Sequence, residues 1–373
     1  MKILLLGEFS NVHWTLACAL RKLGHEVCVV SNGDEWKGYP SDIALVRKPG
    51  RWGAVSYLYK VMRLLPKLRG YDVVQLINPV HFIDLKAERG VRIYDYLRRH
   101  NKRVFLGAFG YDYYHVYDSA VRRTLRYCDF YTPTREVHHE WNTANEHDWL
   151  HTCKKEVSIH VAETCHGIIT GLYEYDVAYR PYFPDKTTFI PFPIDVEGMD
   201  DDVHEIMNAE GMDDAPRKLR FFIGIQRHRT ALKGTDVMLR ALERLVADYP
   251  DRAEMVKVES VPFAQYRQMM RSSDVLLAQI YSYTPAMNAL LAMSQGLILV
   301  GGGEEENYDI LGEKELRPIV NVLPDEEDIY RQLEWLVLHP EHIGRLKRES
   351  QEYIRRHHDS LKVAQRYLEA WTR

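Results

Sequence analysis

The chain has 373 residues, which is more than one ordinary hydrophobic core needs and fits two α/β domains. Its content of 46% hydrophobic and 27% charged residues is that of a globular protein and excludes a disordered or fibrous chain. A formal net charge of −4 gives no general attraction to nucleic acid, and five cysteines without a C-x-x-C pair indicate a reducing compartment and exclude a disulfide framework.

The first residues resemble the start of a signal peptide. The apolar run from Ile3 to Leu6 is too short for one, however, and Glu8 follows without a small-residue cleavage site. A parallel strand buried on both faces and ending at Gly7 explains the run better. No window approaches the roughly 18 apolar residues of a membrane-spanning helix. We therefore expect a cytoplasmic protein.

The N-terminal part alternates short apolar runs with amphipathic stretches. Residues 12–23 predict a helix that Gly24 stops. Further strands are predicted at Val27–Val30, Val73–Ile77, Val104–Leu106 and Ile168–Thr170. Strand, helix and strand in series predict a doubly wound parallel sheet.

A basic segment runs from Arg47 to Arg69, with seven basic residues and no acidic one. A predicted helix there carries Ala54, Leu58, Val61, Met62 and Leu65 on one face and Lys60, Arg63 and Lys67 on the other. Residues 47–69 fit a peripheral contact with an anionic membrane surface, which would bring an enzyme to a lipid-linked acceptor. They fit equally well an ordinary domain helix with a solvated basic face. Pro66 ends the helix in either case.

Two prolines in the extended run 189–195 indicate a stiff crossing into a second domain. An acidic, polar segment follows, from Asp195 to about Asp214, and the βα rhythm then restarts. Strands are predicted at 221–225, 255–261, 275–279 and 297–300, with helices at 235–247, 264–270 and 286–294. A last helix at 360–371 has so apolar a stripe that we expect it to pack back on the first domain.

A loop from Arg227 to Lys233 follows the predicted strand 221–225 and opens a helix at Gly234-Thr235-Asp236. This order places free backbone N–H groups, the positive end of a helix dipole and two cations at the carboxyl edge of a sheet. A diphosphate leaving group needs such an environment. The alternative is that Thr235 or Asp236 caps the helix and the cations are merely solvated.

An ordered set of motifs resembles the C-terminal domain of family-4 glycosyltransferases of GT-B fold, mainly over residues 189–300. The set consists of Ile190-Pro191-Phe192-Pro193-Ile194-Asp195, Lys233-Gly234-Thr235-Asp236, Val261-Pro262, Ser272-Ser273-Asp274 and Pro285 through Gly296. The Gly7 turn and Gly110-Tyr111-Asp112 extend the resemblance loosely into the N-terminal part. It implies two Rossmann-like domains that face each other across a cleft.

The resemblance also implies boundaries: an acceptor-binding domain at 1–190, a nucleotide-sugar-binding domain at 191–355 and a returning helix at 356–373. Arg227 and Lys233 would bind the donor diphosphate, without a metal or cofactor. The turn at Val261 would face the base, and Thr284-Pro285 would approach the donor. Gly7 belongs to the expected binding set as the turn after the first strand.

The chain departs from the family pattern in two motifs. Where relatives carry two glutamates eight residues apart, this chain has Tyr283 and Leu291. Leucine makes no hydrogen bond and a phenol cannot accept two hydroxyls as a carboxylate does, so Tyr283 would stack on a ring, donate one bond or simply pack. The residues considered as substitutes are Gln279, Asn288, Glu304, Glu305 and Glu306.

The second departure is Phe109-Gly110-Tyr111-Asp112, where many relatives have His-Gly-Ser-Asp. Asp112 either binds acceptor hydroxyls or acts as a base, or it forms a turn after Gly110. His13, expected at the lip of the cleft, either acts as a base or acceptor contact or is satisfied locally. His138, His139, His147 and His151 form a cluster without a third ligand at a known spacing, which we interpret as chance.

The sequence thus predicts transfer of a sugar from a nucleotide diphosphate sugar to a hydroxyl of a glycan or lipid-linked acceptor. Retention of the anomeric configuration and a role in polysaccharide or glycolipid assembly follow from the resemblance alone. Two alternatives stay open: a sugar-nucleotide epimerase or hydrolase, and a catalytically silent nucleotide- or glycan-binding protein.

Overall fold

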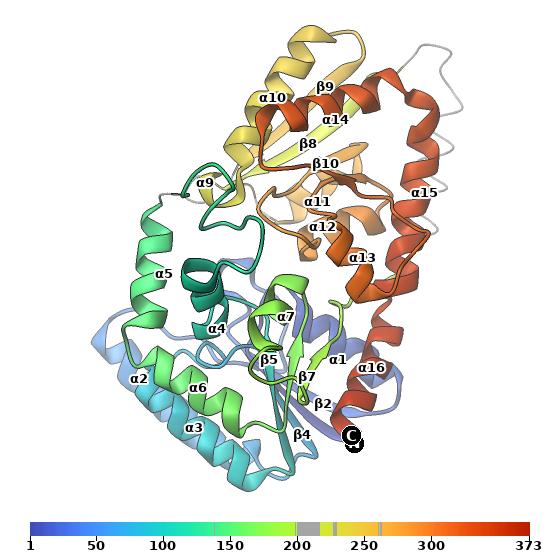
Figure 1. The fold of residues 1–373 in the computed structure, drawn as a ribbon. Helices are drawn as coiled ribbons and strands as arrows, with labels where there is room; N and C mark the ends of the chain where they lie inside the picture. The colour runs from blue at the N-terminus through green and yellow to red at the C-terminus, as the bar shows by residue number, and fades with distance from the viewer. Residues whose placement is uncertain (138, 198, 200–216, 227–229, 260, 262) are drawn as a thin grey trace. The chain divides into compact units, whose positions relative to one another are not determined.

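The computed structural model describes residues 1–373 except 138, 198, 200–216, 227–229, 260 and 262. The described chain divides into two compact units (Figure 1). Unit 1 comprises Met1–Thr124, Glu140–Pro193 and Ser360–Arg373, and unit 2 comprises Leu125–His139 and Ile194–Asp359. The predicted N-terminal domain at 1–190 therefore needs a correction, because the segment Leu125–His139 belongs to unit 2.

Unit 1 contains a seven-stranded sheet in which all strand pairs are parallel. Its strands are β1 (Lys2–Leu6), β2 (Glu26–Ser31), β3 (Ile43–Ala44), β4 (Val73–Leu76), β5 (Arg103–Ala108), β6 (Gly167–Thr170) and β7 (Thr187–Phe189). They lie in the order β3-β2-β1-β4-β5-β6-β7, so the direction of winding reverses between β1 and β4. The predicted doubly wound sheet is confirmed.

Helix α1 (Val12–Lys22) begins directly beyond β1 and packs through Val12, Leu16 and Leu20. These side chains recur at helical spacing and are at most 1% exposed. The helix ends as Gly24 was expected to end it. Gly24 has a φ of +83°, its N–H reaches the Arg21 carbonyl, and the N–H of His25 reaches Leu20. This pattern satisfies carbonyls that a helix end leaves unpaired.

The other helices of unit 1 are α2 (Gly50–Leu64), α3 (Ala87–His100), α4 (Tyr113–Tyr117), α5 (Glu140–Leu150), α6 (Lys154–Thr164), α7 (Tyr173–Tyr179) and α16 (Ser360–Thr372). Helix α16 packs against α1, as its apolar stripe predicted. Trp371 is fully buried, and its Nε1 donates to Oε1 of Gln75 on β4 at 3.0 Å. Arg103 Nη1 donates to the Trp371 carbonyl. Residues almost 270 positions apart are thus joined in one unit.

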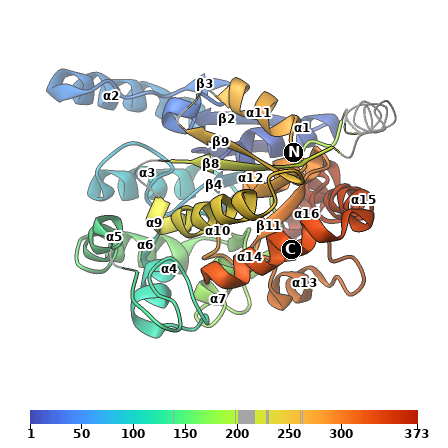
Figure 2. The ribbon, with the colours of Figure 1, turned by 90° about the horizontal axis from the view of Figure 1, so that it is seen from above.

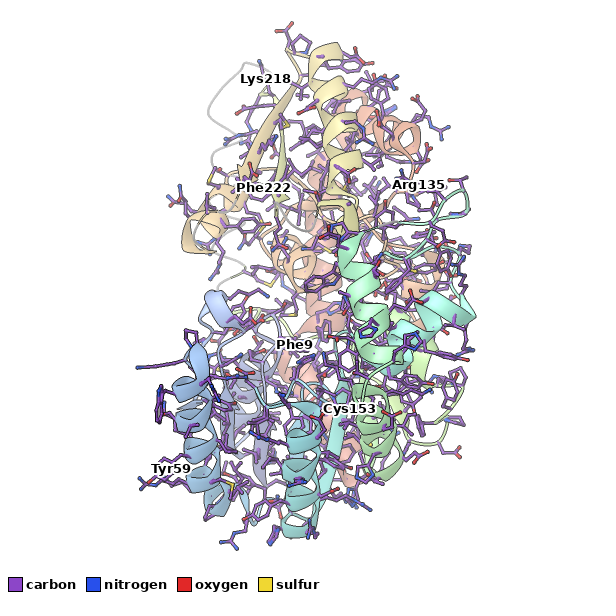
Figure 3. The ribbon with its side chains drawn as sticks, turned by 90° about the vertical axis from the view of Figure 1, so that its left-hand side faces the viewer. Phe9, Tyr59, Arg135, Cys153, Lys218 and Phe222 are labelled. Atoms are coloured by element: carbon purple, nitrogen blue, oxygen red, sulfur yellow. The ribbon has the colours of Figure 1, made fainter. Side chains whose placement is uncertain are left out.

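Helix α2 corrects one prediction about the basic segment. The face that packs on unit 1 carries Tyr57, Val61 and Leu64, whereas Met62, which was expected on the apolar packing face, is 55% exposed. Tyr59 lies on the outer side of the helix (Figure 3). Pro66 follows the end of α2, in a short 3₁₀ segment at Leu65–Leu68.

Unit 2 contains a five-stranded parallel sheet in the order β12-β11-β10-β8-β9. Its strands are β8 (Leu219–Ile225), β9 (Ala253–Glu259), β10 (Val275–Leu277), β11 (Ile298–Gly301) and β12 (Val320–Asn321). Its helices are α9 (Thr230–Lys233), α10 (Thr235–Asp248), α11 (Phe263–Arg271), α12 (Met287–Ser294), α13 (Glu305–Leu311), α14 (Glu326–Leu338) and α15 (Ile343–Tyr353). Helices α10 and α14 lie side by side on one face (Figure 2).

A shared hydrophobic core joins α10 and α14 to the sheet of unit 2 through Met238, Leu242 and Leu333, each fully buried. The edge strands β3 and β12 have two residues each, too few to show a period of two in the sequence. The acidic segment from Asp195 to Asp214 lies mostly outside the described residues. Among the described residues, no helix combines the length and apolar character needed to cross a bilayer.

Candidate functional site

The winding of the unit 2 sheet reverses between β8 and β10. Open α/β sheets bind their ligands outside the carboxyl ends of the strands, at the point where the winding reverses. The loop after β8 leads to Lys233, and the loop after β10 leads to Gln279 and Thr284. Arg227, the other predicted diphosphate contact, lies outside the described residues.

Lys233 ends α9, and Gly234 then turns the chain into α10 with a left-handed φ of +65°. A Cβ on Gly234 would stand 2.2 Å from Cγ1 of Ile280, so only glycine permits this close approach. The Ile280 amide donates to the Lys233 carbonyl at 3.1 Å. Direct backbone contact therefore brings the loops after β8 and β10 together beside the half-buried Lys233.

Helix α10 begins at Thr235 without a side-chain cap from its N-cap residue, which is Gly234. Thr235 is 2% exposed, and its hydroxyl faces the Thr230 carbonyl at 3.4 Å. Asp236, the other capping candidate, pairs with Arg240 one turn along at 3.6 Å. Neither residue fills the role of an N-cap. The first turn of α10 thus offers amide N–H groups and the positive end of the helix dipole beside Lys233.

The other residues predicted to contact the nucleotide sugar lie in the loop after β10, on α12 and just before α11. Thr284 and Pro285 are buried in the loop after β10, and Gln279 is partly exposed there. Asn288 is exposed on α12, and its Nδ2 donates to the hydroxyl of Tyr266 on α11 at 2.9 Å. Tyr266 packs on Gly224, where a Cβ would stand 2.8 Å from the ring. Val261 is partly exposed in the turn before α11.

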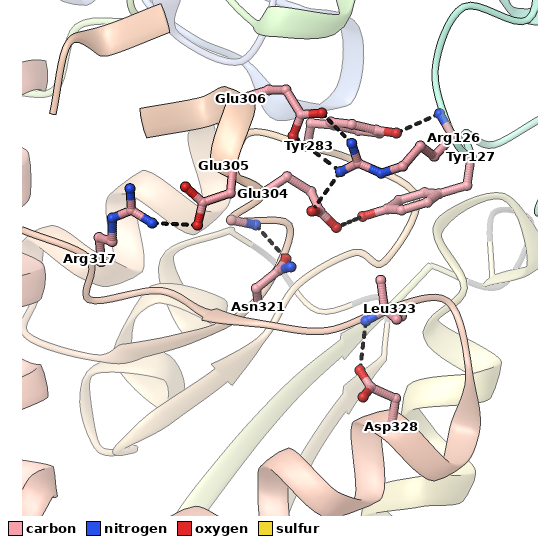
Figure 4. Close-up of polar contacts among 11 residues, drawn as sticks. Arg126, Tyr127, Tyr283, Glu304, Glu305, Glu306, Arg317, Asn321, Leu323 and Asp328 are labelled. Carbon is pink, nitrogen blue, oxygen red and sulfur yellow. Dashed lines mark hydrogen bonds and ion pairs between the residues drawn. The ribbon is translucent and has the colours of Figure 1, made fainter. Parts of the chain in front are cut away.

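Tyr283, where the resemblance implied a glutamate, is a packing residue that also contacts Arg126. Its side chain is 1% exposed, and its hydroxyl accepts a hydrogen bond from the Arg126 amide at 2.6 Å (Figure 4). Its ring lies 5.0 Å from that of Tyr127. Burial raises the pKa of Tyr283 to about 12, so the phenol stays neutral. Leu291, at the other position where the resemblance implied a glutamate, lies half-buried in α12.

Arg126 links the Leu125–His139 segment to two glutamates of unit 2 (Figure 4). Its Nη2 donates to Glu304 at 2.7 Å, and its guanidinium also binds Glu306. The Tyr127 hydroxyl donates to the second oxygen of Glu304. Glu305 pairs instead with Arg317. Glu304 and Glu306, which the sequence suggested as replacements for the missing pair, are therefore engaged by Arg126 and Tyr127.

Arg126 and Tyr127 carry no sequence signal, because nothing in a local pattern places residue 126 beside residue 304. The sequence prediction also passed over Gly301-Gly302-Gly303, which begin at the last residue of β11. A Cβ on Gly302 would stand 1.9 Å from the Ser282 carbonyl oxygen, so the loops after β10 and β11 touch there. Three consecutive glycines beyond a predicted strand were a usable signal of a close backbone approach.

In unit 1 the winding reverses between β1 and β4, and the loop after β1 carries Gly7, Glu8 and His13. Gly7 has a φ of +82°, and a Cβ there would stand 2.3 Å from Cγ2 of Ile77 beyond β4. The Glu8 carboxylate accepts from the amides of His13 and Trp14 at 3.2 and 2.9 Å, and so caps α1. Burial raises the pKa of Glu8 to about 8 against the effect of those amides.

The sequence placed His13 at the lip of the expected cleft, and the structure describes the surroundings of this residue in unit 1. Its side chain is fully buried, and Nδ1 lies 2.8 Å from the Gly7 carbonyl. Nε2 has no hydrogen-bond partner among the residues that the structure describes. Burial lowers the pKa of His13 to about 4, so the imidazole is neutral at pH 7, with Nδ1 protonated toward Gly7 and Nε2 able to accept.

Asp112 is the N-cap of α4 and is fully buried. One oxygen accepts the His115 amide at 3.0 Å, and the other accepts the Tyr179 hydroxyl at 2.7 Å. Burial raises the pKa of Asp112 to about 6. Both carboxyl oxygens of Asp112 therefore accept hydrogen bonds, one from α4 and one from α7. This local role agrees with the interpretation of Asp112 as a turn-forming residue after Gly110.

The histidine cluster does not form a metal site in the described residues. His147 and His151 come within 6.2 Å of each other, measured between ring centroids, and His138 lies outside the described residues. The one group of the described chain with metal-like spacing is His339, Glu341 and His342, at the end of α14. Those residues contact each other: Glu341 Oε1 lies 3.0 Å from His339 Nδ1.

No protein-family model matches the chain, and no curated protein sequence matches it either. Solved structures, in contrast, match the whole chain. Anabaena HepE in complex with UDP and glucose has a TM-score of 0.60 at 11% identity, over 100% of this chain and 99% of that one. Sucrose-phosphate synthase from Thermosynechococcus elongatus has a TM-score of 0.61 at 12% identity, over 100% and 98%.

The same likeness extends to a UDP-GlcNAc 2-epimerase from Neisseria meningitidis bound to UDP-GlcNAc, with a TM-score of 0.54 at 11% identity over 99% of both chains. Identity this low carries information about the fold and not about the reaction. The likeness extends over both units, since each of these structures covers at least 99% of this chain. The chain has the GT-B fold.

Proposed function

We propose that the protein is a glycosyltransferase that uses a nucleotide diphosphate sugar as donor, with unit 2 binding the donor and unit 1 the acceptor. The observation that carries this proposal is the Lys233-Gly234-Thr235 turn, where a cation, the start of α10 and the loop after β10 meet at the carboxyl edge of the sheet. A diphosphate is the ligand chemistry that suits this combination. The HepE structures, which hold UDP, UDP and glucose, or UDP-glucose, support the choice of nucleotide.

In the proposed reaction a bond forms between the acceptor oxygen and the anomeric carbon, and the bond from that carbon to the diphosphate oxygen breaks. The electron pair leaves with the nucleoside diphosphate, and the acceptor proton passes to a base. Lys233, Arg227 and the α10 amides would stabilise the charge that develops on the leaving group. We propose that this needs no metal, because fixed cations take that role; turnover that depends on an added divalent metal would overturn this part.

For the proton, His13 is a better candidate than Asp112. His13 is neutral and Nε2 is unpaired among the described residues, whereas both oxygens of Asp112 already accept hydrogen bonds. A pKa of about 4 makes His13 a weak base in the absence of substrate. Its role therefore requires an acceptor or donor charge that raises the pKa in the complex.

The test is Lys233→Ala. We expect turnover to fall by more than about 100-fold, since a group that stabilises developing charge typically contributes that much. The matched control is Lys218→Ala, because Lys218 is exposed just before β8, at the opposite edge of the same sheet. Thermal stability should be unchanged in both variants, and the stabilisation by added UDP should be lost only in Lys233→Ala. Near-normal turnover in Lys233→Ala would contradict the assignment of this turn as the donor diphosphate site.

A second candidate function is a sugar-nucleotide epimerase or hydrolase, which the likeness to the UDP-GlcNAc 2-epimerase favours. Such an enzyme consumes the donor with no acceptor present, so a donor-only assay distinguishes the two reactions. A catalytically silent binding protein is favoured by Tyr283, which is buried and engaged with Arg126 where relatives carry a glutamate. Saturable nucleotide-sugar binding without turnover across a broad acceptor panel would identify it.

A further inference from the structure

Helix α2 exposes a stripe of large apolar side chains. Trp52 is 87% exposed, the highest value among the large apolar side chains that the structure describes, and Val55, Tyr59 and Met62 are 60%, 61% and 55% exposed. Spacings of three, four and three residues place all four within an arc of about 80° on a regular helix. We call these four residues the α2 stripe.

The α2 stripe is not the face by which the helix packs on its own unit. That face is formed by Tyr57, Val61 and Leu64, which are buried. The Tyr57 hydroxyl accepts the amide of Asp84 at 3.0 Å, and the Tyr96 hydroxyl donates to the Leu65 carbonyl at 3.1 Å. These contacts fix the rotation of α2 about its axis, so the stripe points to solvent while the opposite face is satisfied.

Basic side chains border the α2 stripe. On a regular helix Arg51 lies at one margin of the stripe, and Arg63 and Lys60 lie at the other. Arg63 lies over the Tyr59 ring, 5.8 Å from its centroid. Among the described residues, neither Arg51 nor Lys60 forms an ion pair. From Arg47 to Arg69 the sequence contains seven basic residues and no acidic one, so nothing within the segment neutralises this charge.

We propose that the α2 stripe docks on an anionic lipid bilayer, with α2 lying in the plane of the interface. The apolar residues would enter the boundary between headgroups and acyl chains, where tryptophan and tyrosine are favoured. The bordering lysines and arginines would contact anionic headgroups. Uniform positive charge around an apolar stripe is complementary to a surface that is negative everywhere, and this is the reason for choosing a bilayer over a protein partner of mixed charge.

The experiment is co-sedimentation of the whole protein with phosphatidylcholine vesicles, with and without phosphatidylglycerol. We expect binding only to the anionic vesicles, weakened by added salt. The double variant Arg51→Glu/Lys60→Glu should lose at least about 25-fold in affinity, since each cation contributes about fivefold. Trp52→Ala/Tyr59→Ala should lose more than about tenfold through the apolar area that it no longer buries.

Matched controls separate this surface from general charge and from misfolding. Lys218→Glu/Lys314→Glu changes the same charge on exposed residues of unit 2 and should bind vesicles like the unaltered protein. Vesicles should also cause a blue shift in tryptophan fluorescence that Trp52→Phe removes. Binding to anionic vesicles that the α2 variants leave unchanged would overturn the proposal. So would a dimer in solution that the α2 variants dissociate, because the stripe would then be covered by a second copy.

Discussion

The two sheets reverse their winding in the same way, yet their carboxyl edges are built from different chemistry. In unit 1 the edge holds groups whose pKa is shifted chiefly by burial, in the direction that disfavours charge: the pKa of Glu8 is raised to about 8 and that of Asp112 to about 6, and the pKa of His13 is lowered to about 4. In unit 2 it holds the half-buried Lys233 at the start of a helix. The same sheet topology thus supplies buried titratable groups at one carboxyl edge and a cation beside a helix start, suited to an anion, at the other.

The largest expected effect comes from the glycine turns that both edges share. Gly7→Ala and Gly234→Ala each place a Cβ within 2.3 Å of an isoleucine side chain at a positive φ. We expect each to lower the free energy of unfolding of its unit by about 3 kcal/mol, from backbone strain and overpacking together. Hydrogen exchange would report the two units separately. Only Gly234→Ala should also lower affinity for UDP.

Matched glycines test whether packing causes this loss. Gly24 in unit 1 and Gly312 in unit 2 have similar φ values of +83° and +70°, and a Cβ on either would meet nothing within 4 Å. Gly24→Ala and Gly312→Ala should cost only the strain, about 1 kcal/mol. An equal loss of stability in all four variants would show that the close contacts at Gly7 and Gly234 do not add to the cost of backbone strain.

The next effect concerns acid. Because the pKa of His13 is about 4 in the folded chain and 6.5 in its ordinary state, the unfolded chain binds the proton more readily between these values. The stability contributed by neutral His13 is therefore fully present above pH 6.5 and is lost as the pH falls toward 4. The difference is about 3 kcal/mol.

His13→Gln removes this titration while keeping a side chain that can donate toward Gly7. Measured by urea unfolding from pH 7 to pH 4, the variant should lose about 3 kcal/mol less stability than the unaltered protein across that window. The prediction concerns how the free energy of unfolding changes with pH, and not the stability of the variant at pH 7. Identical slopes would mean that His13 is protonated in the folded chain.

The smallest effect is expected in unit 2. Tyr283→Phe removes the acceptor of the Arg126 amide and should cost about 1 to 2 kcal/mol, the value of a buried donor left unsatisfied. Tyr367→Phe in unit 1 is the control, because the Tyr367 hydroxyl is buried and has no hydrogen-bond partner in the described chain. That change should cost nothing measurable. An equal loss in both variants would contradict the role given to the Arg126 contact.

The sequence predicted the elements whose signal is local. Strands such as β1 and β8 are continuous apolar runs, and α1 ends at a glycine that its conformation requires. It could not predict which of two apolar faces of α2 is buried, since Met62 and Val61 are equally apolar and only the partner surface separates them. Nor could it place Arg126 against Glu304, which depends on the path of the chain through space.

Within the candidate site, the sequence located the Lys233-Gly234 turn, because a strand, a loop and a helix start are visible in order. It misjudged His13, expected near a surface and found fully buried. A histidine on a helix after a strand gives no indication of depth by itself. Depth depends on residues distant in the sequence, such as Phe109, whose ring centroid lies 6.4 Å from that of the His13 imidazole.

The return of α16 to unit 1 has a consequence for the order in which the chain can finish folding during synthesis. Unit 2 has all its residues once Asp359 is made, because Leu125–His139 precedes the rest of it. Unit 1 begins first but lacks Trp371, which is fully buried against Gln75, until residues 360–373 follow. The unit that begins first in translation is therefore completed last, and the face of α1 on which α16 packs stays uncovered meanwhile.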